Sequence, residues 1–586
     1  MKKYLYGSAI ILLLLFTGQM PLSLEAKSEY KPKRSVVWVK TEKNVMVKMP
    51  DGVKLATDIY LPAKKIPAPV ILVRTPYGKN KSASMGRKFA QYGYAVVIQD
   101  VRGRYNSEGN FYPFVDDALD GKTTISWILS QPWSNGKIGT FGASYLGTVQ
   151  WAVAPDEPAI KAMNMRLTSP NYKEVIYQGG ELHLMTVFSW SVAMGEHKSN
   201  TKIISKAGQL NNLMATLPLS QADNQTTGYN IVYFDDILDT QGNALNLMRK
   251  MDYSQNYAKI SAPIITYAGW YDMFLGPQLK DYQKVLTQGK SEAKNSHLVI
   301  GPWAHGPNGD GTVSYGDQVK DLDQFQQALA WFGHYLKGED TGIEKWARVK
   351  IFVMGENKWR DENEWPLART VYTRYYLHSS GNANTRTGDG VLNTELPGRE
   401  PPDKFDYDPM NPVPTRGGCN LGLSAGAYNQ SKIEDRQDVL VYTSEVLVED
   451  VEVTGPISAT LFAASSAIDT DFTVKLVDVY PDGTPVNIQD GIIRASYREG
   501  DMERPSLIEP GKIYEYQIDL WATSNLFKKG HRIRVEVSSS NFPRFNRNLN
   551  TGEPIFNAIQ SVIAHQTIYH DSEHPSYITL PVIPRQ

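Results

Sequence analysis

The sequence has few of the features that mark disulfide-stabilised, membrane-embedded or nucleic-acid-binding proteins. Among its 586 residues Cys419 is the only cysteine, so the chain can form no internal disulfide and must rely on its core for stability. The 61 basic and 62 acidic residues nearly cancel, which leaves no net charge to attract nucleic acid or an anionic membrane. No apolar run reaches the roughly 18 residues that a transmembrane helix requires. What is abundant is apolar surface, because 41% of the residues are hydrophobic, and the length favours a globular protein of several domains.

The N-terminal segment has the pattern of a secretory signal peptide. Lys2 and Lys3 precede an apolar run over residues 9–16, and Pro21 and the small residue Ala26 follow it. The run is too short to span a bilayer stably. The sequence therefore predicts cleavage after Ala26 and a mature protein that is secreted or extracytoplasmic and no longer attached to the membrane. A retained N-terminal anchor is the alternative.

Residues 27–346 have the pattern of an α/β domain. Two strand-like runs flank the Asp51-Gly52 dipeptide, which predicts a β-hairpin. Near-continuous apolar runs then alternate with stretches able to form helices, which predicts a parallel sheet with right-handed crossovers. These runs are APVILVRTPYG, YAVVIQDVRG, GKIGTFGAS, APIITYAGW and SHLVIGPW. Residues 170–258, between the third and fourth runs, carry methionine, leucine and aromatic residues at helical spacing and predict a helical insertion.

Residues 347–586 have a different pattern. Short strands, of which VKIFVMG is the first, are divided by Gly, Pro, Asn and Asp, and no helix of useful length intervenes. This spacing predicts a separate all-β domain, a β-sandwich or jelly roll.

The segment GTFGASYLG places Ser144 where a buried strand gives way to a helix. At such a turn a serine hydroxyl is exposed above the sheet, and Gly142 lets the strained backbone pass close by. The N-terminus of the following helix favours negative charge that develops there. Ser144 is therefore a candidate nucleophile. The motif is G-x-S-x-x-G, with Leu146 at the expected glycine and Gly147 one position later, and in a chain with 46 glycines it is a weak signal by itself.

A serine nucleophile needs a base, and the base needs a carboxylate to orient it. Asp272 directly follows APIITYAGWY and His305 directly follows SHLVIGPWA, so both belong at the sheet edge where a parallel sheet collects its active-site loops. The chain order Ser, Asp, His is that of α/β-hydrolases. Of the ten histidines only His305 combines this order with a strand end and Gly and Pro neighbours. The alternative is a structural loop histidine and an aspartate that caps a strand end.

Acyl transfer also needs hydrogen-bond donors for the oxyanion. The backbone N–H of Tyr145, directly after the candidate nucleophile, is one. Tyr77 in RTPYGK follows an earlier parallel strand. It is either the second donor, through its hydroxyl, or a loop tyrosine fixed by Pro76.

Five segments carry a more specific signature: RTPYGK, DVRGRYNSEGNF, SWILSQPWSNGKIGTFGASYLGTVQWAVA, GWYDMF and GPWAHG. Together they resemble the cocaine esterase and X-prolyl dipeptidyl-peptidase-like family of serine hydrolases, which also contains glutaryl-cephalosporin acylases and α-amino-acid ester hydrolases. The resemblance runs from about residue 35 to the end of the chain. It implies an α/β-hydrolase domain with a helical cap and a C-terminal jelly roll, and the displaced glycine is that family's own form of the turn. The implied roles are nucleophile for Ser144, orienting acid for Asp272, base for His305, and oxyanion hole for Tyr77 and the Tyr145 amide.

The resemblance also bears on the substrate, a small acyl ester or amide. It implies that Phe274, two residues after the acid, lines the acyl pocket, which favours an apolar acyl group. Family members that recognise a free amino group tend to have acidic residues beside the catalytic acid, and GWYDMFLGPQL offers none after Asp272. A cap carboxylate such as Glu181 is the alternative. We therefore expect a secreted serine hydrolase of ester or amide bonds, with Xaa-Pro dipeptidyl-peptidase or β-lactam side-chain (glutaryl) acylase activity as alternatives. A non-catalytic secreted ligand-binding protein is the alternative outside the enzymes.

Two further groups of charged residues admit a structural interpretation. Those of DVRGRYNSEG are either a polar catalytic cluster or, as we favour, an ion-pair network that supports the Ser144 turn. They are Asp100, Arg102, Arg104 and Glu108. Asp469 and Asp471 resemble a cation-binding loop only superficially, because the glycine and terminal glutamate of an EF-hand are missing. With no H-E-x-x-H, no paired cysteines and no phosphate-binding G-K-[ST], we expect no metal and no organic cofactor. The sequence makes no prediction of oligomeric state.

Overall fold

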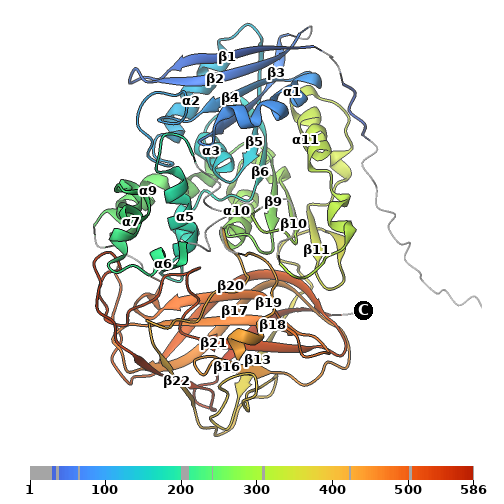
Figure 1. Cartoon of the computed structure of the whole chain (residues 1–586). Coiled ribbons are helices and arrows are strands. Elements are labelled where there is room, and N and C mark those ends of the chain that lie inside the picture. Colours follow the sequence, from blue (N-terminus) through green and yellow to red (C-terminus); the bar gives the residue numbers. More distant parts are fainter. Residues whose placement is uncertain are drawn as a thin grey trace, which may run out of the picture.

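The computed structural model of the chain consists of an α/β part that packs on an all-β part (Figure 1). The structure describes residues 30–34, 38–63, 66–199, 210–240, 242–305, 311–421, 424–500 and 504–584. The predicted signal peptide lies outside these residues. Among the described helices, none has both the length and the apolar character needed to cross a membrane.

The α/β part is built on a sheet of ten described strands in the order β1-β2-β4-β3-β5-β6-β9-β10-β11-β12. As predicted, β1 and β2 form an antiparallel hairpin around Asp51-Gly52. From β4 to β11 in this order each strand is parallel to the next, while β2 is antiparallel to β4 and β12 is antiparallel to β11. Their bounds are β1 (Val39–Lys48), β2 (Lys54–Pro62), β3 (Ala68–Thr75), β4 (Ala95–Asp100), β5 (Ser134–Ala143), β6 (Ile160–Arg166), β9 (Ile264–Gly269), β10 (His297–Gly301), β11 (Val349–Val353) and β12 (Lys358–Glu362).

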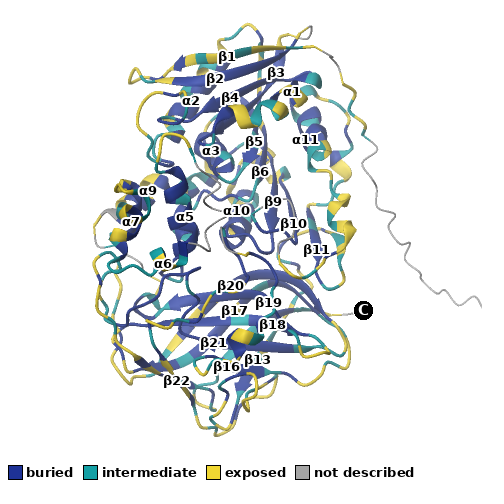
Figure 2. Cartoon of the chain, viewed as in Figure 1, coloured by how far each residue is buried: buried dark blue, intermediate teal, exposed yellow. Residues whose placement is uncertain are grey.

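Helices cover both faces of this sheet, because its central strands are apolar on both faces. Every residue of β3 and β4 is buried, and Figure 2 shows these strands in dark blue. One face shares an apolar core with α2, α3 and α10, and the other with α1 and α11. The bounds are α1 (Ala83–Gln91), α2 (Asp117–Leu129), α3 (Tyr145–Val153), α10 (Leu275–Gln288) and α11 (Gln324–Phe332). The predicted α/β class, with a parallel sheet and intervening helices, is confirmed.

The segment between β6 and β9 is mostly helical, in the region where the sequence predicts an insertion. Its described elements are α4 (Tyr172–Ile176), β7 (Tyr177–Gln178), β8 (Glu181–Leu182), α5 (Leu184–Met194), α6 (Asn211–Met214), α7 (Ala222–Thr227), α8 (Val232–Leu238) and α9 (Asn243–Met251). Residues of this segment, which we call the cap, share one apolar core with Tyr145 and Phe274 of the α/β part. The cap therefore covers the carboxyl edge of the sheet, where the candidate site residues lie.

Within the described residues the C-terminal part is all-β, as predicted, apart from the one-turn helix α12 (Ser431–Glu434) and a short 3-10 helix at Ala495–Tyr497. Its strands belong to a single eleven-stranded hydrogen-bonded network within the described residues, and a single apolar core gathers residues from most of them. They are β13 (Val371–His378), β14 (Val391–Asn393), β15 (Asp403–Tyr407), β16 (Leu440–Thr443), β17 (Val451–Ser465), β18 (Asp471–Val479), β19 (Pro485–Arg494), β20 (Tyr514–Phe527), β21 (Arg532–Ser538), β22 (Ala564–Tyr569) and β23 (Tyr577–Ile583).

One strand lies in a different sheet from the one we predicted. The sequence pattern predicts that VKIFVMG belongs to the all-β domain, but its residues form β11, which pairs in parallel with β10 and places Leu298 opposite Val349. The α/β sheet therefore extends past residue 346, the predicted end of that domain. A short apolar strand has the same residue pattern in either sheet, so its sequence does not show which sheet it joins. Here it pairs with the edge of β10.

The α/β part and the all-β part are joined by a common apolar core. Trp270, which follows β9, and Trp521 of β20 belong to the same apolar cluster. Backbone hydrogen bonds from Met354 to Ser524 and from Leu526 to Met354 join the end of β11 to β20. A Cβ atom on Gly276 of α10 would lie 2.3 Å from the Trp521 ring, so only glycine allows this approach. The all-β part thus supports the edge of the α/β sheet that carries Asp272.

A buried carboxyl group in α10 makes the stability of this fold dependent on pH. Burial raises the pKa of Asp281 to about 7, although hydrogen bonds from Ser169 and Tyr257 oppose the shift. Between the ordinary aspartate pKa of 3.8 and this value, the unfolded chain loses the proton while the folded chain keeps it. The free energy of unfolding therefore falls as the pH rises through this window and stays lower above it.

We expect Asp281→Asn to remove this loss of stability at high pH. The variant should melt about 2–5 °C above the parent at pH 8, and the difference should narrow at pH 5. Differential scanning calorimetry of both proteins at the two pH values measures it. A difference that is equal at both pH values, or larger at pH 5, would contradict the prediction.

Candidate active site

Ser144 occupies a strained turn between β5 and α3. Its φ of 57° and ψ of −126° are rare for a residue with a side chain. The turn is held by backbone hydrogen bonds from Ser144 to Arg166, at the end of neighbouring β6, and from Gly147 and Thr148 back to Ser144. The strand, the sharp turn and the helix predicted from GTFGASYLG are all present.

Two glycines allow this turn to form. Gly142 has a φ of 156°, and a Cβ atom on it would lie 2.4 Å from Leu146 Cβ. A Cβ atom on Gly147 would lie 2.4 Å from Thr168 Cγ2, on the chain just after β6. Because Gly147 and not residue 146 faces this neighbour, the glycine is needed three positions after the serine. This explains the spacing G-x-S-x-x-G in place of G-x-S-x-G.

Asp272 and His305 come together at the carboxyl edge of adjacent parallel strands. Asp272 follows β9 and His305 follows β10, and Asp272 Oδ2 lies 2.6 Å from His305 Nδ1. Asp272 is fully buried, and its other oxygen, Oδ1, accepts a hydrogen bond of 2.9 Å from the Phe274 backbone N–H. Because the carboxylate accepts at Nδ1, the ring carries its proton there, which leaves Nε2 as the nitrogen able to accept a proton.

Phe274 connects this pair to the Ser144 turn. Its ring centroid lies 5.5 Å from that of His305, and its side chain lines the same pocket as Ser144. The candidate pair and the candidate nucleophile are thus placed at one edge of the sheet by three strand ends, those of β5, β9 and β10.

Tyr77 approaches Ser144 from the end of β3. Its backbone N–H donates to Thr75 Oγ1, which fixes the start of the loop. Its hydroxyl accepts a hydrogen bond of 3.1 Å from Trp190 Nε1 in cap helix α5, and its side chain lines the same pocket as Ser144. Burial raises the pKa of the Tyr77 phenol, and donation from Trp190 opposes the shift. The hydroxyl therefore stays protonated at neutral pH and can act as a hydrogen-bond donor.

The side chain of Tyr145, which lines the pocket, is held by hydrogen bonds at its hydroxyl. Its hydroxyl donates to Asp117 Oδ2 at 2.7 Å and accepts from the Phe114 backbone N–H at 3.1 Å. Arg74 lies 3.2 Å from the other oxygen of Asp117. Burial, reinforced by Asp117, raises the pKa of the Tyr145 phenol well above its usual range, so the phenol remains a donor. This chain of contacts holds Tyr145, and with it the backbone N–H predicted to face an oxyanion.

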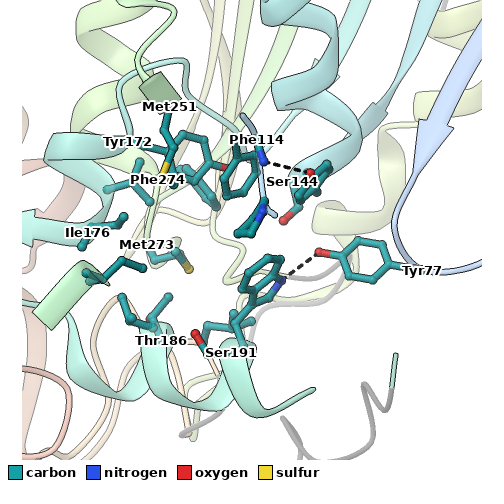
Figure 3. Close-up of a pocket in the computed structure, with 17 residues that line it drawn as sticks. Tyr77, Phe114, Ser144, Tyr172, Ile176, Thr186, Ser191, Met251, Met273 and Phe274 are labelled. Carbon is teal, nitrogen blue, oxygen red and sulfur yellow. Dashed lines mark hydrogen bonds between the residues drawn. The ribbon is translucent and has the colours of Figure 1, made fainter. Parts of the chain in front are cut away.

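The pocket beside Ser144 is almost entirely apolar (Figure 3). It holds about 570 Å³ of empty space. Its walls come from the α/β part, the cap and, through Leu421, the all-β part. None of the described residues that line it carries a charge. They are Tyr77, Pro113, Phe114, Ser144, Tyr145, Tyr172, Val175, Ile176, Thr186, Val187, Trp190, Ser191, Ile237, Met251, Met273, Phe274 and Leu421.

Several of these residues were not predicted from the sequence. Trp190 and Leu421 reach the pocket from the cap and the all-β part, and no local motif marks either of them. Asp117, which holds Tyr145, lies at the first position of α2 and looks in the sequence like an ordinary acidic residue of a helix N-terminus. Only the packing of distant segments gives these side chains their position.

The charged residues of DVRGRYNSEG form structural contacts and do not line the pocket among the described residues. Lys79 Nζ lies 3.1 Å from Asp100, and Arg102 binds Asp120 at 2.6 Å. Glu108 accepts from the Lys54 backbone N–H. Arg104 binds backbone carbonyls of the cap. These contacts support a structural role, but only Asp100 and Arg102 form ion pairs in them, and none of the four contacts involves the Ser144 turn.

Glu181, the cap carboxylate named above as a possible binder of an amino group, lies elsewhere. It is fully buried in β8, where it forms an ion pair with Arg494 of the all-β part. Burial raises its pKa well above the usual range, and Arg494 opposes the shift. Asp469 and Asp471 face the same arginine. This cluster joins cap and all-β part and offers no carboxylate to the pocket.

No group of three or more metal-ligating side chains occurs within the part of the chain that the structure describes. Cys419 is buried, and its thiol forms a hydrogen bond to the side chain of Gln489.

Comparison with known families gives two matches. The X-Pro dipeptidyl-peptidase (S15 family) profile matches residues 51–307, and the X-Pro dipeptidyl-peptidase C-terminal non-catalytic domain profile matches residues 341–579. Among curated proteins, a cocaine esterase from Rhodococcus sp. (strain MB1 Bresler) is 41% identical over 571 residues, which cover 92% of this chain and 98% of the relative. A putative serine esterase from Mycobacterium bovis is 26% identical and covers 92% of this chain and 94% of its own length.

Solved structures agree with the fold. An α-amino acid ester hydrolase superposes with a TM-score of 0.76 at 25% identity, over 96% of this chain and 100% of the other. An aminopeptidase from the marine sediment archaeon Thaumarchaeota archaeon superposes with a TM-score of 0.81 at 24% identity, over 96% of this chain and 99% of the other.

Proposed function

Because this chain belongs to the X-Pro dipeptidyl-peptidase (S15) family of hydrolases, we propose that it is a secreted serine esterase that cleaves esters of uncharged, apolar acyl groups. The observation that carries the proposal is the pocket beside Ser144, which is apolar and has no charged residue among its described walls. The likeness to a cocaine esterase, 41% identical over nearly the whole chain, supports ester hydrolysis.

In the proposed mechanism, Ser144 Oγ attacks the carbonyl carbon while His305 Nε2 takes its proton. Asp272 keeps the other ring proton on Nδ1 and stabilises the imidazolium that forms. The hydrogen bond of 2.6 Å between Asp272 and His305 supports these roles. When the tetrahedral intermediate collapses, His305 gives its proton to the leaving alcohol and Ser144 retains the acyl group. Water, activated by His305, then releases the acid and restores the serine.

The oxyanion of this intermediate needs two donors on one side of Ser144. We assign them to the Tyr77 hydroxyl and the Tyr145 backbone N–H. The position of Tyr77, which lines the same pocket as Ser144, supports the first assignment. The position of Tyr145, at the start of α3 and directly after Ser144, supports the second.

Export is part of the proposal. The basic residues, the apolar run and Ala26 at the N-terminus support removal of residues 1–26 and action outside the cytoplasm.

The apolar pocket predicts strong discrimination against a charged amino group. p-Nitrophenyl propionate and alanine p-nitrophenyl ester differ by one ammonium group at the carbon next to the carbonyl. Burying that ammonium in a pocket without a carboxylate costs several kcal/mol, so we expect kcat/KM to be at least about 100-fold higher for the propionate. Initial rates on both esters, corrected for spontaneous hydrolysis, measure the ratio.

Gly-Pro-p-nitroanilide tests the peptidase alternative in the same assay. We expect little or no release of p-nitroaniline from it. A preference for this peptide, or for the alanine ester over the propionate, would contradict the esterase proposal and favour a dipeptidyl-peptidase.

A further inference from the structure

One indole ring of the cap contacts side chains of both residues that carry the proposed oxyanion donors. Trp190 Nε1 donates to the Tyr77 hydroxyl at 3.1 Å, the bond that ends on Tyr77 in Figure 3. The same ring stacks on Tyr145, with centroids 6.2 Å apart and planes inclined by 15°. It also stacks on Phe114, at 5.9 Å and 18°. A residue of α5 thus reaches the centre of a site whose other proposed parts come from strand ends of the α/β sheet.

The chemistry of this hydrogen bond fixes the direction of the Tyr77 proton. An indole N–H can only donate, so the Tyr77 oxygen must accept at this contact. A phenol carries one proton, and that proton must therefore point away from Trp190. Tyr77 and Ser144 line the same pocket. With the indole on one side of the phenolic oxygen, the proton is left to face this pocket, where an oxyanion would form beside Ser144.

The same bond makes Tyr77 a better donor. Burial raises the pKa of the phenol, which keeps the proton on the oxygen, while donation from Trp190 draws electron density from that oxygen and opposes the shift. In a buried chain of hydrogen bonds each donation strengthens the next, so the bond from Trp190 strengthens the one that Tyr77 donates.

Arg104 holds the helix that carries Trp190 against the loop that carries Tyr77. Its fully buried guanidinium donates to the Pro76 carbonyl, next to Tyr77, and to the Met194 carbonyl at the last residue of α5. It also donates to the Glu196 carbonyl just beyond that helix. A cation at a helix C-terminus is favourable, and here it joins the cap to the end of β3. The geometry between Trp190 and Tyr77 is therefore built into the fold and does not depend on a bound substrate.

From these contacts we propose that Trp190 is a positioning residue of the reaction, which acts through Tyr77 by directing the phenolic proton at the oxyanion. The inference rests on the function proposed above for Ser144 and Tyr77, and extends it to a residue of the cap.

Trp190→Phe keeps an aromatic ring in the stack and removes the N–H. We expect kcat for p-nitrophenyl propionate to fall about tenfold, with KM changed less than about twofold, because the lost bond acts on the transition state. Incorporation of 3-benzothienylalanine at position 190 replaces the N–H with sulfur at nearly the same shape, and should give the same loss of kcat. It keeps the test valid if the phenylalanine variant folds poorly. Unchanged kcat in both variants would overturn the inference.

A double-mutant cycle with Tyr77→Phe separates positioning from packing. Tyr77→Phe alone should lower kcat about 10²- to 10³-fold. Adding Trp190→Phe should then cost little more, because the bond it removes no longer exists. A second tenfold loss in the Tyr77→Phe background would show that Trp190 acts by packing and would overturn the inference.

Tyr233→Phe is the matched control in the cap. Tyr233 donates to the Ser191 carbonyl, and its ring lies 6.2 Å from that of Trp190, yet it makes no hydrogen bond to Tyr77. This variant should keep the parental kcat, and a tenfold loss in it would contradict the specific role of Trp190.

If instead Tyr77→Phe retains full kcat, the proposed oxyanion role of Tyr77 is wrong, and the inference about Trp190 is wrong with it. If kcat falls in Tyr77→Phe but not in Trp190→Phe, the inference about Trp190 is overturned while the proposed role of Tyr77 stands.

Discussion

Ser144→Ala is expected to lower kcat/KM for p-nitrophenyl propionate by roughly four to six orders of magnitude, with the melting temperature nearly unchanged. The variant removes one oxygen atom and leaves the turn intact, because Gly142 and Gly147 supply the space that the turn requires. Without Oγ no acyl-enzyme can form. The residual rate should come from donors that still stabilise an oxyanion while water attacks directly. Steady-state kinetics at high enzyme concentration measure the loss.

Labelling by a fluorophosphonate distinguishes this result from a general loss of structure. The parent should be labelled at a single serine and Ser144→Ala should not be labelled. Ser126→Ala, which removes an exposed hydroxyl of α2 that bonds only within its helix, is the matched control and should be labelled like the parent. A parent that is not labelled would favour the non-catalytic ligand-binding alternative, and labelling of Ser144→Ala would place the nucleophile at another residue.

Most of the fold follows from burial patterns within single segments. The runs that form β3, β4, β9 and β10 are largely apolar and buried along their whole length, which is typical of strands covered on both sides. The ends of parallel strands meet at one edge of a sheet, so strand positions alone predicted that Asp272 and His305 would lie close together. The pairing of β9 with β10 brings the two loops side by side, and the hydrogen bond forms between them.

The parts that the sequence did not predict depend on contacts between distant segments. VKIFVMG is apolar and short, and nothing within it shows whether it completes one sheet or begins another. Trp190 lies in a helix of the cap that is buried on almost all sides, where a tryptophan that contacts Tyr77 looks like any core residue. For Glu181 the sequence suggested a role in the pocket that the structure does not show. Glu181 lies in the cap as the sequence indicated, but it forms an ion pair with Arg494, which is more than 300 residues away along the chain.

Asp272→Asn is expected to lower kcat about 10⁴-fold while leaving the pocket and the fold in place. The reason is specific to this geometry. Asp272 Oδ1 accepts from the Phe274 N–H, so the amide oxygen of an asparagine must take that position and its NH₂ group must face His305 Nδ1. The imidazole then has to accept at Nδ1 and carry its proton on Nε2, where it can no longer take the proton of Ser144. Asp281→Asn makes the same chemical change in another buried carboxyl group, in the helix that follows, and should keep the parental kcat. Measured side by side, a loss confined to Asp272→Asn supports the proposed tautomer, whereas a loss of less than about tenfold would mean that Asp272 does not orient the base.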